Sequence, residues 1–418
     1  IMPRLTIEGG CQLKGTVRTS GAKNAALPLL AATILLEGET VLSNTPHLDD
    51  VVTMIRMLNS LGLRAEYHSH QTVKIWNNRK IRHIAPYELV TAMRASFFVA
   101  GPILARTGFA KVPLPGGCSI GTRPVDLHLK AFEALGAKIS IEHGFVEIKA
   151  KELIGNRHHL DFPSVGATEN LMMAATLAKG ETVIGNAARE PEIEDLGEML
   201  IKAGAKMTGV GTSTITVQGV DRLHGVDHSV VPDRIEAATL LIAAAITKGE
   251  VTVENALIEH LEVVVQKLRD CGLEVGVNGR DIHLKYVGEL KPVDFETLPH
   301  PGFPTDTQAQ MMALLTVANG SSVIKETIFE NRYMHAQELI RMGADIKVDG
   351  AQAIVAGVSG LSGAEVKITD LRAGAALILA GLIAEGKTTV RGLKHLNRGY
   401  ENLPKKLNKL GARILDIQ

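Results

Sequence analysis

The stretch Leu171-Met-Met-Ala-Ala-Thr-Leu-Ala-Lys-Gly-Glu-Thr-Val-Ile-Gly-Asn186 holds the pattern that decides the fold. An apolar run ends at Gly180, and the residues after it alternate in polarity. Glycine is favoured just past the end of a helix because it tolerates the left-handed backbone conformation. We therefore expect a buried helix, a glycine C-cap and a strand. An amphipathic segment and a second glycine, Gly204, follow.

The same pattern occurs six times along the chain. The first glycines, which recur every 66–72 residues, are Gly38, Gly108, Gly180, Gly249, Gly320 and Gly386. The second glycines are Gly62, Gly136, Gly204, Gly272, Gly343 and Gly411. Each repeat thus contains two helices and several strands, and one such unit cannot bury both faces of its sheet alone. The repeats must therefore pack together.

Six repeats can stack as one solenoid or close as two groups of three, and we favour two groups. A polar, glycine-containing stretch at 224–231 follows the third repeat, and the first strands precede the first buried helix. We therefore expect a first lobe of residues 23–230 with repeats one to three. The second lobe would hold residues 1–22 and 231–418 with repeats four to six. Two links would make a hinge, with a ligand cleft between the lobes.

Composition excludes several classes of protein. The 418 residues carry 45 Lys and Arg against 45 Asp and Glu, so no bulk positive field attracts nucleic acid. Apolar runs fall short of the roughly 18–20 residues that span a bilayer, so we expect no membrane insertion. Residues 1–30 show no signal-peptide pattern, and Ile1 before Met2 is expected to be a processing remnant.

The three cysteines, Cys11, Cys118 and Cys271, show no metal-ligand spacing. We therefore expect free thiols, no metal and a reducing, cytoplasmic location. We expect the scattered histidines, including His228, to be solvated.

A glycine-rich loop at 115–121 surrounds Cys118. Such a run reads as a surface loop, where Arg123 could favour the thiolate. The alternative is that Cys118 is a small buried hydrophobic residue. The two glycines of the second repeat are 28 residues apart, against 23–25 in the others, and the excess falls in this loop. A loop lengthened in one repeat favours a functional role for Cys118.

Charged residues stand where the apolar helices begin, as at Lys23, Arg94 and Arg372. Helix N-termini bind anions, so these ends would form an anion site if they meet in one cleft. A cation there opposes the helix dipole by about 0.3–1 kcal/mol, so it needs an anionic partner. The alternative for Asp233, Asp306 and Asp370 is ordinary N-capping.

A set of motifs extends along almost the whole chain. They are Ser20-Gly-Ala-Lys-Asn-Ala-Ala-Leu-Pro28, Met93-Arg-Ala-Ser96, Pro115-Gly-Gly-Cys-Ser-Ile-Gly121, Arg123-Pro-Val-Asp-Leu-His128, Ser164-Val-Gly-Ala-Thr168, Ala187-Ala-Arg-Glu-Pro-Glu-Ile193, Pro232-Asp-Arg-Ile-Glu236, Phe303-Pro-Thr-Asp306, Glu326-Thr-Ile-Phe-Glu-Asn-Arg332, Thr369-Asp-Leu-Arg372 and Asn397-Arg-Gly-Tyr400. With these motifs the chain resembles the UDP-N-acetylglucosamine enolpyruvyl transferases (1-carboxyvinyltransferases) of the EPSP synthase-like superfamily.

The resemblance implies an α/β (α+β) fold, a two-lobed inside-out α/β barrel of six βαβαββ repeats. It also implies transfer of the enolpyruvyl group of phosphoenolpyruvate to the 3-hydroxyl of UDP-N-acetylglucosamine, with release of phosphate. This reaction is the first committed step of peptidoglycan synthesis and uses no metal or organic cofactor.

Residue roles carry over position by position. Cys118 matches the loop thiol proposed as general acid, which also forms an adduct with phosphoenolpyruvate, and Asp306 matches the candidate base. The residues expected at phosphoenolpyruvate are Lys23, Asn24, Arg123 and Arg398, of which Asn24 also matches a sugar contact. Those expected at the nucleotide-sugar are Arg94, Arg123, Pro124, Val125, Asp126, Leu127, Ser164, Val165, Gly166, Asp306 and Ile328. Further cleft charges are Asp233, Arg234, Glu330, Arg332, Asp370 and Arg372.

One departure and two alternatives remain open. Phe162 stands where some members place a lysine, so a diphosphate contact of that lysine is absent. Members with aspartate at the cysteine position escape fosfomycin; this chain keeps Cys118, which predicts sensitivity. The related 3-phosphoshikimate 1-carboxyvinyltransferases lack the cysteine loop and carry Gly-Ser-Lys-Ser in the first motif. A non-catalytic nucleotide-sugar-binding repeat protein is the other alternative.

Overall fold

The computed structural model describes residues 3–78, 80–115 and 125–417. The predicted site residues Cys118, Arg123 and Pro124 therefore lie outside the described residues. The described chain forms two compact units. The N-terminal unit contains the described residues from Gly21 to Val231, and the C-terminal unit contains those up to Ser20 and from Pro232 onward.

Each unit is built around three buried helices. In the N-terminal unit they are α1 (Lys23–Ala32), α4 (Ala100–Thr107), which continues the 3-10 helix η1 (Arg94–Val99), and α6 (Val165–Ala175). In the C-terminal unit they are α8 (Arg234–Ile246), α10 (Gln308–Leu315) and α12 (Leu371–Ile383), which pack against one another. Their sequences are apolar on nearly every side, which is why they lie in the core.

Amphipathic helices lie outside the buried ones. They are α2 (Asp49–Leu61), α5 (Asp126–Ala134), α7 (Pro191–Lys202), α9 (Glu262–Asp270), α11 (Met334–Arg341) and α13 (Leu403–Lys409). The second glycine of every repeat follows one of them directly or by one residue and has a positive φ. Short helices are α3 (Tyr87–Ala92) and the 3-10 turns η2 (Ile258–His260), η3 (Thr305–Thr307) and η4 (Leu396–Arg398).

The prediction that the first glycines cap helices is correct only for Gly108, which ends α4 with φ 71°. Gly38 instead lies within a strand, and Gly249 lacks a positive φ. In the other repeats the buried helix ends earlier and a short turn leads to the glycine. The glycine therefore marks the start of the strand rather than the end of the helix.

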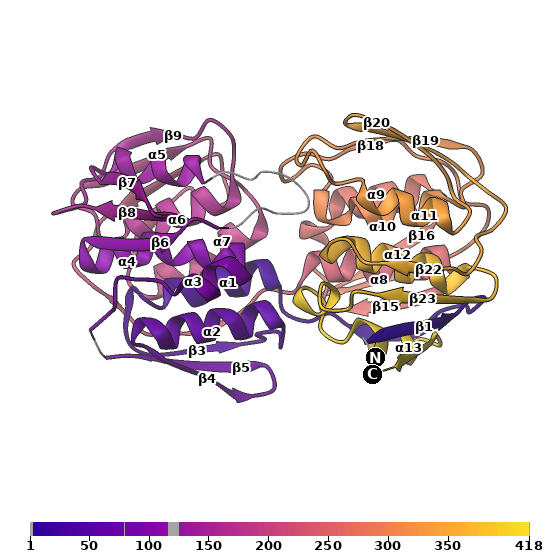
Figure 1. The fold of residues 1–418 in the computed structure, drawn as a ribbon, viewed down its shortest axis with the longest axis horizontal. Helices are drawn as coiled ribbons and strands as arrows, with labels where there is room; N and C mark the ends of the chain where they lie inside the picture. Colours follow the sequence, from indigo (N-terminus) through magenta and orange to yellow (C-terminus); the bar gives the residue numbers. More distant parts are fainter. Residues whose placement is uncertain (1–2, 79, 116–124, 418) are drawn as a thin grey trace. The chain divides into compact units, whose positions relative to one another are not determined.

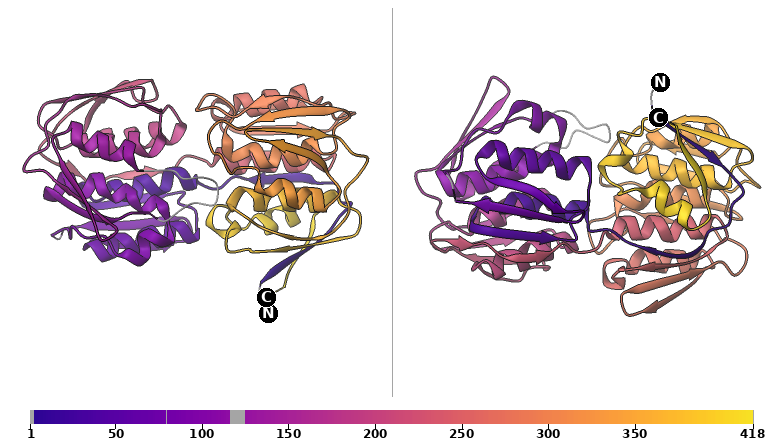
Figure 2. Two further views of the ribbon diagram at one scale, coloured as in Figure 1. Left: turned by 45° about the horizontal axis from the view of Figure 1, so that its top comes forward. Right: turned by 90° about the horizontal axis from the view of Figure 1, so that it is seen from below.

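The N-terminal unit contains three sheets, ordered β14-β3-β5-β4 with β13 also on β3, β6-β8-β7 and β11-β12-β10-β9. Their strands are β3 (Leu36–Ser43), β4 (Arg64–Ser69), β5 (Thr72–Asn77), β6 (Phe109–Pro113), β7 (Lys138–Glu142), β8 (Phe145–Lys149), β9 (Arg157–His159), β10 (Glu181–Gly185), β11 (Lys206–Thr208), β12 (Thr214–Gln218), β13 (Leu223–His224) and β14 (Asp227–Ser229). Figure 2 shows the strands of each unit around its buried helices.

The C-terminal unit also contains three sheets, ordered β22-β23-β1-β24, β16-β17-β15-β2 and β18-β19-β21-β20. Their strands are β1 (Arg4–Glu8), β2 (Lys14–Arg18), β15 (Glu250–Glu254), β16 (Glu274–Asn278), β17 (Asp281–Lys285), β18 (Phe295–Glu296), β19 (Ser321–Lys325), β20 (Asp345–Asp349), β21 (Gln352–Ala356), β22 (Glu365–Lys367), β23 (Lys387–Arg391) and β24 (Arg413–Ile417).

The N-terminal strands complete two sheets that later repeats begin. β1 lies between β23 and β24, antiparallel to both, and β2 pairs in parallel with β15. Both ends of the chain therefore meet in one sheet (Figure 1). In the other repeats a leading strand such as β9 or β18 pairs in parallel with the first strand of the next hairpin. This recurring order is the βαβαββ plan of the six repeats.

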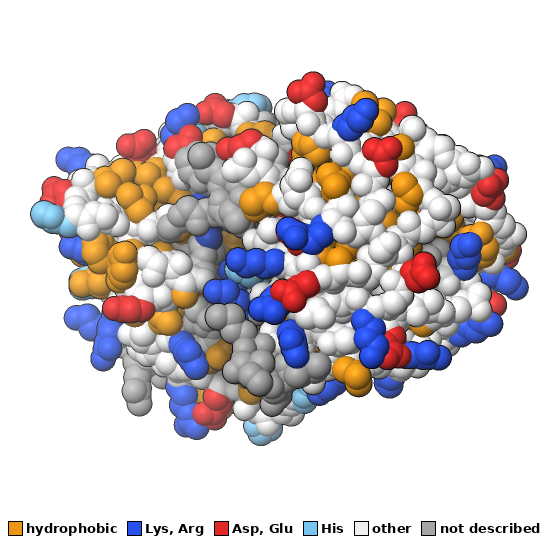
Figure 3. Space-filling model, turned by 45° about the vertical axis from the view of Figure 1, so that its right-hand side comes forward, with side chains coloured by type: hydrophobic (Ala, Val, Ile, Leu, Met, Phe, Trp, Pro, Cys, Tyr) orange, Lys and Arg blue, Asp and Glu red, His pale blue; other side chains and the backbone are white. Residues whose placement is uncertain are grey.

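No helix in the described chain has both the length and the apolar character needed to cross a bilayer. On the face drawn in Figure 3, positive and negative side chains are mixed, with hydrophobic ones scattered between them.

The prediction that His228 is solvated is wrong. The residue is buried, and its Nε2 lies 2.7 Å from Asp195 Oδ1.

Candidate active site

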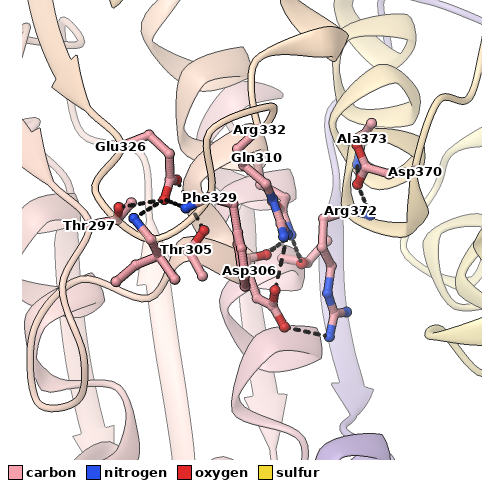
Figure 4. Close-up of polar contacts among 12 residues, drawn as sticks. Thr297, Thr305, Asp306, Gln310, Glu326, Phe329, Arg332, Asp370, Arg372 and Ala373 are labelled. Carbon is pink, nitrogen blue, oxygen red and sulfur yellow. Dashed lines mark hydrogen bonds and ion pairs between the residues drawn. The ribbon is translucent and has the colours of Figure 1, made fainter. Parts of the chain in front are cut away.

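A carboxylate held by two arginines forms the centre of the site in the C-terminal unit (Figure 4). Asp306 Oδ1 lies 3.0 Å from Arg332 Nη2, and its Oδ2 lies 3.3 Å from Arg372 Nη2. Both arginine side chains are 3% exposed, whereas that of Asp306 is 25% exposed. Solvent can therefore reach the carboxylate, while the two cations are fixed in the protein.

Three predicted aspartates lie at or near the N-termini of the buried helices of this unit. Asp370 caps α12 by accepting hydrogen bonds from the backbone N–H groups of Arg372, at 2.9 Å, and Ala373, at 3.1 Å. Asp233 caps α8 in the same way. The N-capping interpretation is thus correct for Asp233 and Asp370. It is wrong for Asp306, which lies in η3 and directs its carboxylate to the two guanidinium groups.

A buried polar network lies beneath the carboxylate. Gln310 Nε2 lies 3.0 Å from the backbone oxygen of Asp306 and 2.9 Å from Tyr400 Oη. The guanidinium carbon of Arg372 is 5.1 Å from the centre of the Tyr400 ring, a cation–π contact. Burial alone would lower the pKa of Arg372, but Tyr400, Asp306 and Asp233 raise it above its usual value. Arg372 is therefore a permanent cation.

Four other residues of the C-terminal unit were predicted to belong to the site. Arg234 is the buried first residue of α8, and Arg398 is the half-buried last residue of η4. Ile328 is half-buried and Glu330 is exposed, and both belong to the segment that leads to Arg332.

Lys23 begins α1 in the N-terminal unit and has an anionic partner. Its Nζ lies 2.7 Å from Asp50 Oδ2, and the two side chains are 11% and 5% exposed. Asp50 lies in the first turn of α2 and so supplies the negative charge that a cation at a helix N-terminus requires. Asn24 follows Lys23 and is half-buried, and Arg94 begins η1.

Two helix N-termini of the N-terminal unit lie side by side. Val125, Asp126 and Leu127 form the start of α5, and Ser164, Val165 and Gly166 form the start of α6. The starts are joined by His128 of α5. Its Nδ1 lies 3.0 Å from Asn170 Nδ2, and a Cβ on Gly166 would lie 3.0 Å from its Cε1. Such a pair of helix starts can bind phosphate groups through backbone N–H donors.

Sequence reasoning missed the residues that support these groups. Asp50, Gln310 and Glu326 are buried polar residues, and each has a partner far away in sequence: Lys23, Tyr400 and Thr297, respectively. The sequence did indicate that Lys23, as a cation at a helix N-terminus, needs an anionic partner. It did not indicate that this partner is Asp50. Within the described residues, no cluster of three or more His, Cys, Asp or Glu side chains is arranged to hold a metal ion.

Comparison with known proteins gives consistent matches. Residues 7–407 match the sequence profile of the EPSP synthase (3-phosphoshikimate 1-carboxyvinyltransferase) family. UDP-N-acetylglucosamine 1-carboxyvinyltransferase 1 of Caldanaerobacter subterraneus subsp. tengcongensis is 54% identical over 98% of this chain and 99% of its own length. The protein of the same name from Staphylococcus aureus is 53% identical over 99% of both chains.

Solved structures agree with the fold. The enolpyruvyl transferase NikO from Streptomyces tendae is 26% identical, with a TM-score of 0.90 over 99% of both chains. EPSP synthase from Acinetobacter baumannii, 21% identical, has a TM-score of 0.78 over 100% of both chains and shows the shared fold. The chain therefore belongs to the EPSP synthase family and, within it, to the UDP-N-acetylglucosamine 1-carboxyvinyltransferases.

Proposed function

We propose that this protein transfers the enolpyruvyl group of phosphoenolpyruvate to the 3-hydroxyl of UDP-N-acetylglucosamine and releases phosphate. The observation that carries the proposal is 53–54% identity over 98–99% of the chain to relatives named for this activity. The reaction would supply the first committed step of peptidoglycan synthesis. The proposed binding partners of the protein are these two small molecules. The proposal involves neither nucleic acid nor insertion into a membrane.

The chemistry assigns a role to each charged group. The sugar hydroxyl loses a proton as its oxygen attacks C2 of phosphoenolpyruvate, and C3 gains a proton. The tetrahedral intermediate then loses phosphate and a C3 proton, which restores the double bond. Asp306 is the proposed acceptor of the hydroxyl proton, because its carboxylate is exposed to solvent and fixed in place by Arg332 and Arg372.

Two groups of residues are proposed to hold the anionic substrates. Lys23, Asn24, Arg123 and Arg398 are proposed to bind phosphoenolpyruvate. Charge-assisted bonds of this kind are worth about 1.5–3 kcal/mol each. Cys118 is proposed as the acid that protonates C3. Arg94 and the adjacent starts of α5 and α6 are proposed to bind the nucleotide-sugar, where backbone N–H groups can approach its diphosphate.

The alternative acceptor is shikimate 3-phosphate, since the family profile carries that activity in its description. The two relatives described above, at 53–54% identity, are both named for the nucleotide-sugar, which favours UDP-N-acetylglucosamine. A purely binding protein is disfavoured because Asp306, Cys118 and Arg398 are all retained. A cytoplasmic location is part of the proposal, because the three widely spaced cysteines fit a reducing compartment.

Phosphate release from phosphoenolpyruvate tests the proposal. The wild type should release phosphate with UDP-N-acetylglucosamine and not with shikimate 3-phosphate. The Cys118→Ala variant should lose this release. Release with shikimate 3-phosphate alone would assign the chain to the other activity, and release that survives in the variant would remove the acid role from Cys118.

Inhibition by fosfomycin is a second consequence of Cys118. We propose that the thiolate opens the epoxide and forms a thioether, which blocks the site. Mass spectrometry of the treated protein should find one fosfomycin on the peptide that contains Cys118, with parallel loss of activity. A fully active protein after prolonged treatment would argue against an accessible thiolate.

A further inference from the structure

Glu326 is a buried carboxylate that joins two segments of the active site. Its residue is 3% exposed and directly follows β19. Oε1 accepts hydrogen bonds from Thr297 Oγ1 at 2.8 Å, from Ile328 N at 2.9 Å and from Phe329 N at 3.2 Å. Oε2 accepts one from Thr305 Oγ1 at 3.0 Å (Figure 4).

Three of the four donors belong to the segments that carry the charged centre. Thr305 immediately precedes Asp306 in η3. Ile328 and Phe329 begin the segment that leads to Arg332, and the guanidinium carbon of Arg332 lies 5.6 Å from the centre of the Phe329 ring. The segments that carry Asp306 and Arg332 are therefore connected twice: directly by the ion pair, and also through hydrogen bonds to Glu326.

Thr297 ties the same carboxylate to the neighbouring strand. Its backbone N–H donates to Lys325 O at 2.9 Å, and its Oγ1 accepts from Thr327 N at 3.0 Å. The next residue, Leu298, donates its N–H to Phe303 O at 3.0 Å, just before the turn that carries Asp306. Glu326 thus lies at the junction of three chain segments.

We propose that Glu326 is a positioning residue that sets the place of Asp306 relative to Arg332, an inference that rests on the proposed function. A carboxylate suits this junction because both oxygens only accept, and four donors converge on them. A glutamine would present an amide N–H₂ to one of these donors. If that group faced Thr305, the hydroxyl would have to turn and accept instead of donate.

Glu326 acts through Asp306, so its loss should reduce kcat more than it raises KM. Displacement of a reacting group by about 1 Å can cost on the order of 100-fold in rate. Glu326→Ala removes all four bonds and should reduce kcat about 10–100-fold. Glu326→Gln can keep the three bonds to Oε1 and should fall between Glu326→Ala and the wild type.

Glu296→Gln is the matched control. Glu296 precedes Thr297, but its side chain is 41% exposed and pairs with Lys325 at 3.0 Å. This variant should keep the wild-type kcat. A double-mutant cycle with Asp306→Asn separates positioning from general weakening: in the Asp306→Asn background, Glu326→Ala should change kcat by no more than about twofold.

Hydrogen exchange provides a readout that does not depend on activity. In Glu326→Ala, peptides that cover 303–310 and 326–333 should exchange faster than in the wild type, and Glu296→Gln should leave both unchanged. Unchanged exchange in both peptides would overturn the inference, as would a multiplicative effect of Glu326→Ala on the Asp306→Asn rate. An inactive wild type would reject the proposed function alone, and the exchange result would still decide the role of Glu326.

Discussion

Loss of one member of the Lys23–Asp50 ion pair should destabilise the N-terminal unit strongly. The Nζ–Oδ2 distance is 2.7 Å, and the side chains are 11% and 5% exposed. At an effective dielectric constant near 20, two unit charges at this distance attract by about 6 kcal/mol. Removing one member of a buried pair typically costs about 3–5 kcal/mol, because the remaining buried charge loses its counter-ion. We therefore expect Asp50→Ala to destabilise by about 3–5 kcal/mol.

Urea unfolding measures this loss, and Asp49→Ala is the matched control. Asp49 is an exposed carboxylate in the same first turn of α2, so its removal deletes the same favourable interaction with the helix dipole. That interaction is worth about 0.3–1 kcal/mol. Asp49→Ala should therefore cost less than about 1 kcal/mol.

The Lys23→Ala background isolates the pair. Asp50→Ala should cost much less there, because no buried cation is left behind. Phosphoenolpyruvate should raise the unfolding midpoint of Asp50→Ala more than that of the wild type, since its phosphate can replace the missing carboxylate beside Lys23. Equal costs of Asp50→Ala with and without Lys23, or a cost no larger than that of Asp49→Ala, would refute the reasoning.

Three further predictions follow from named contacts. Asp306→Asn should lower kcat by about 10²–10⁴-fold in the phosphate-release assay, because the amide cannot accept the hydroxyl proton; a near-normal kcat would exclude Asp306 as base. Burial raises the pKa of Glu236 from 4.5 to about 7, so its contribution to stability is present at low pH and lost as pH rises through 7. Urea unfolding of the wild type should therefore show a loss of about 2–3 kcal/mol between about pH 5 and pH 8 that Glu236→Gln lacks; identical pH profiles would contradict this. Gly101→Ala would place a Cβ 2.6 Å from Asn170 O and should cost about 1–3 kcal/mol in urea unfolding, whereas Gly276→Ala, with open space around it, should cost little; equal effects would contradict the packing argument.

The repeated fold was predictable because the sequence marks its helix ends. The second glycines follow amphipathic helices in all six repeats, where the backbone requires a positive φ. The first glycines were less informative, because turns separate five of them from the helices before them. The sequence pattern locates an element, but hydrogen bonding in the turn decides where the helix ends.

The charged centre was only partly predictable. Asp306, Arg332 and Arg372 belong to recognisable motifs, but their ion pairs join residues 26 and 66 positions apart, which no local pattern reveals. Asp50 and Glu326 were missed for the same reason, since each acts through a partner placed by packing. The capping roles of Asp233 and Asp370 could be anticipated because capping depends on neighbours in sequence.

Identification of the product tests the central claim most directly. The protein should be incubated with phosphoenolpyruvate and UDP-N-acetylglucosamine, and the nucleotide-sugar then analysed by NMR. The account predicts a new vinyl group joined through oxygen to C3 of the sugar, formed in equal amount to the phosphate released. Phosphate release with an unmodified sugar, or an enolpyruvyl group at another position, would contradict it.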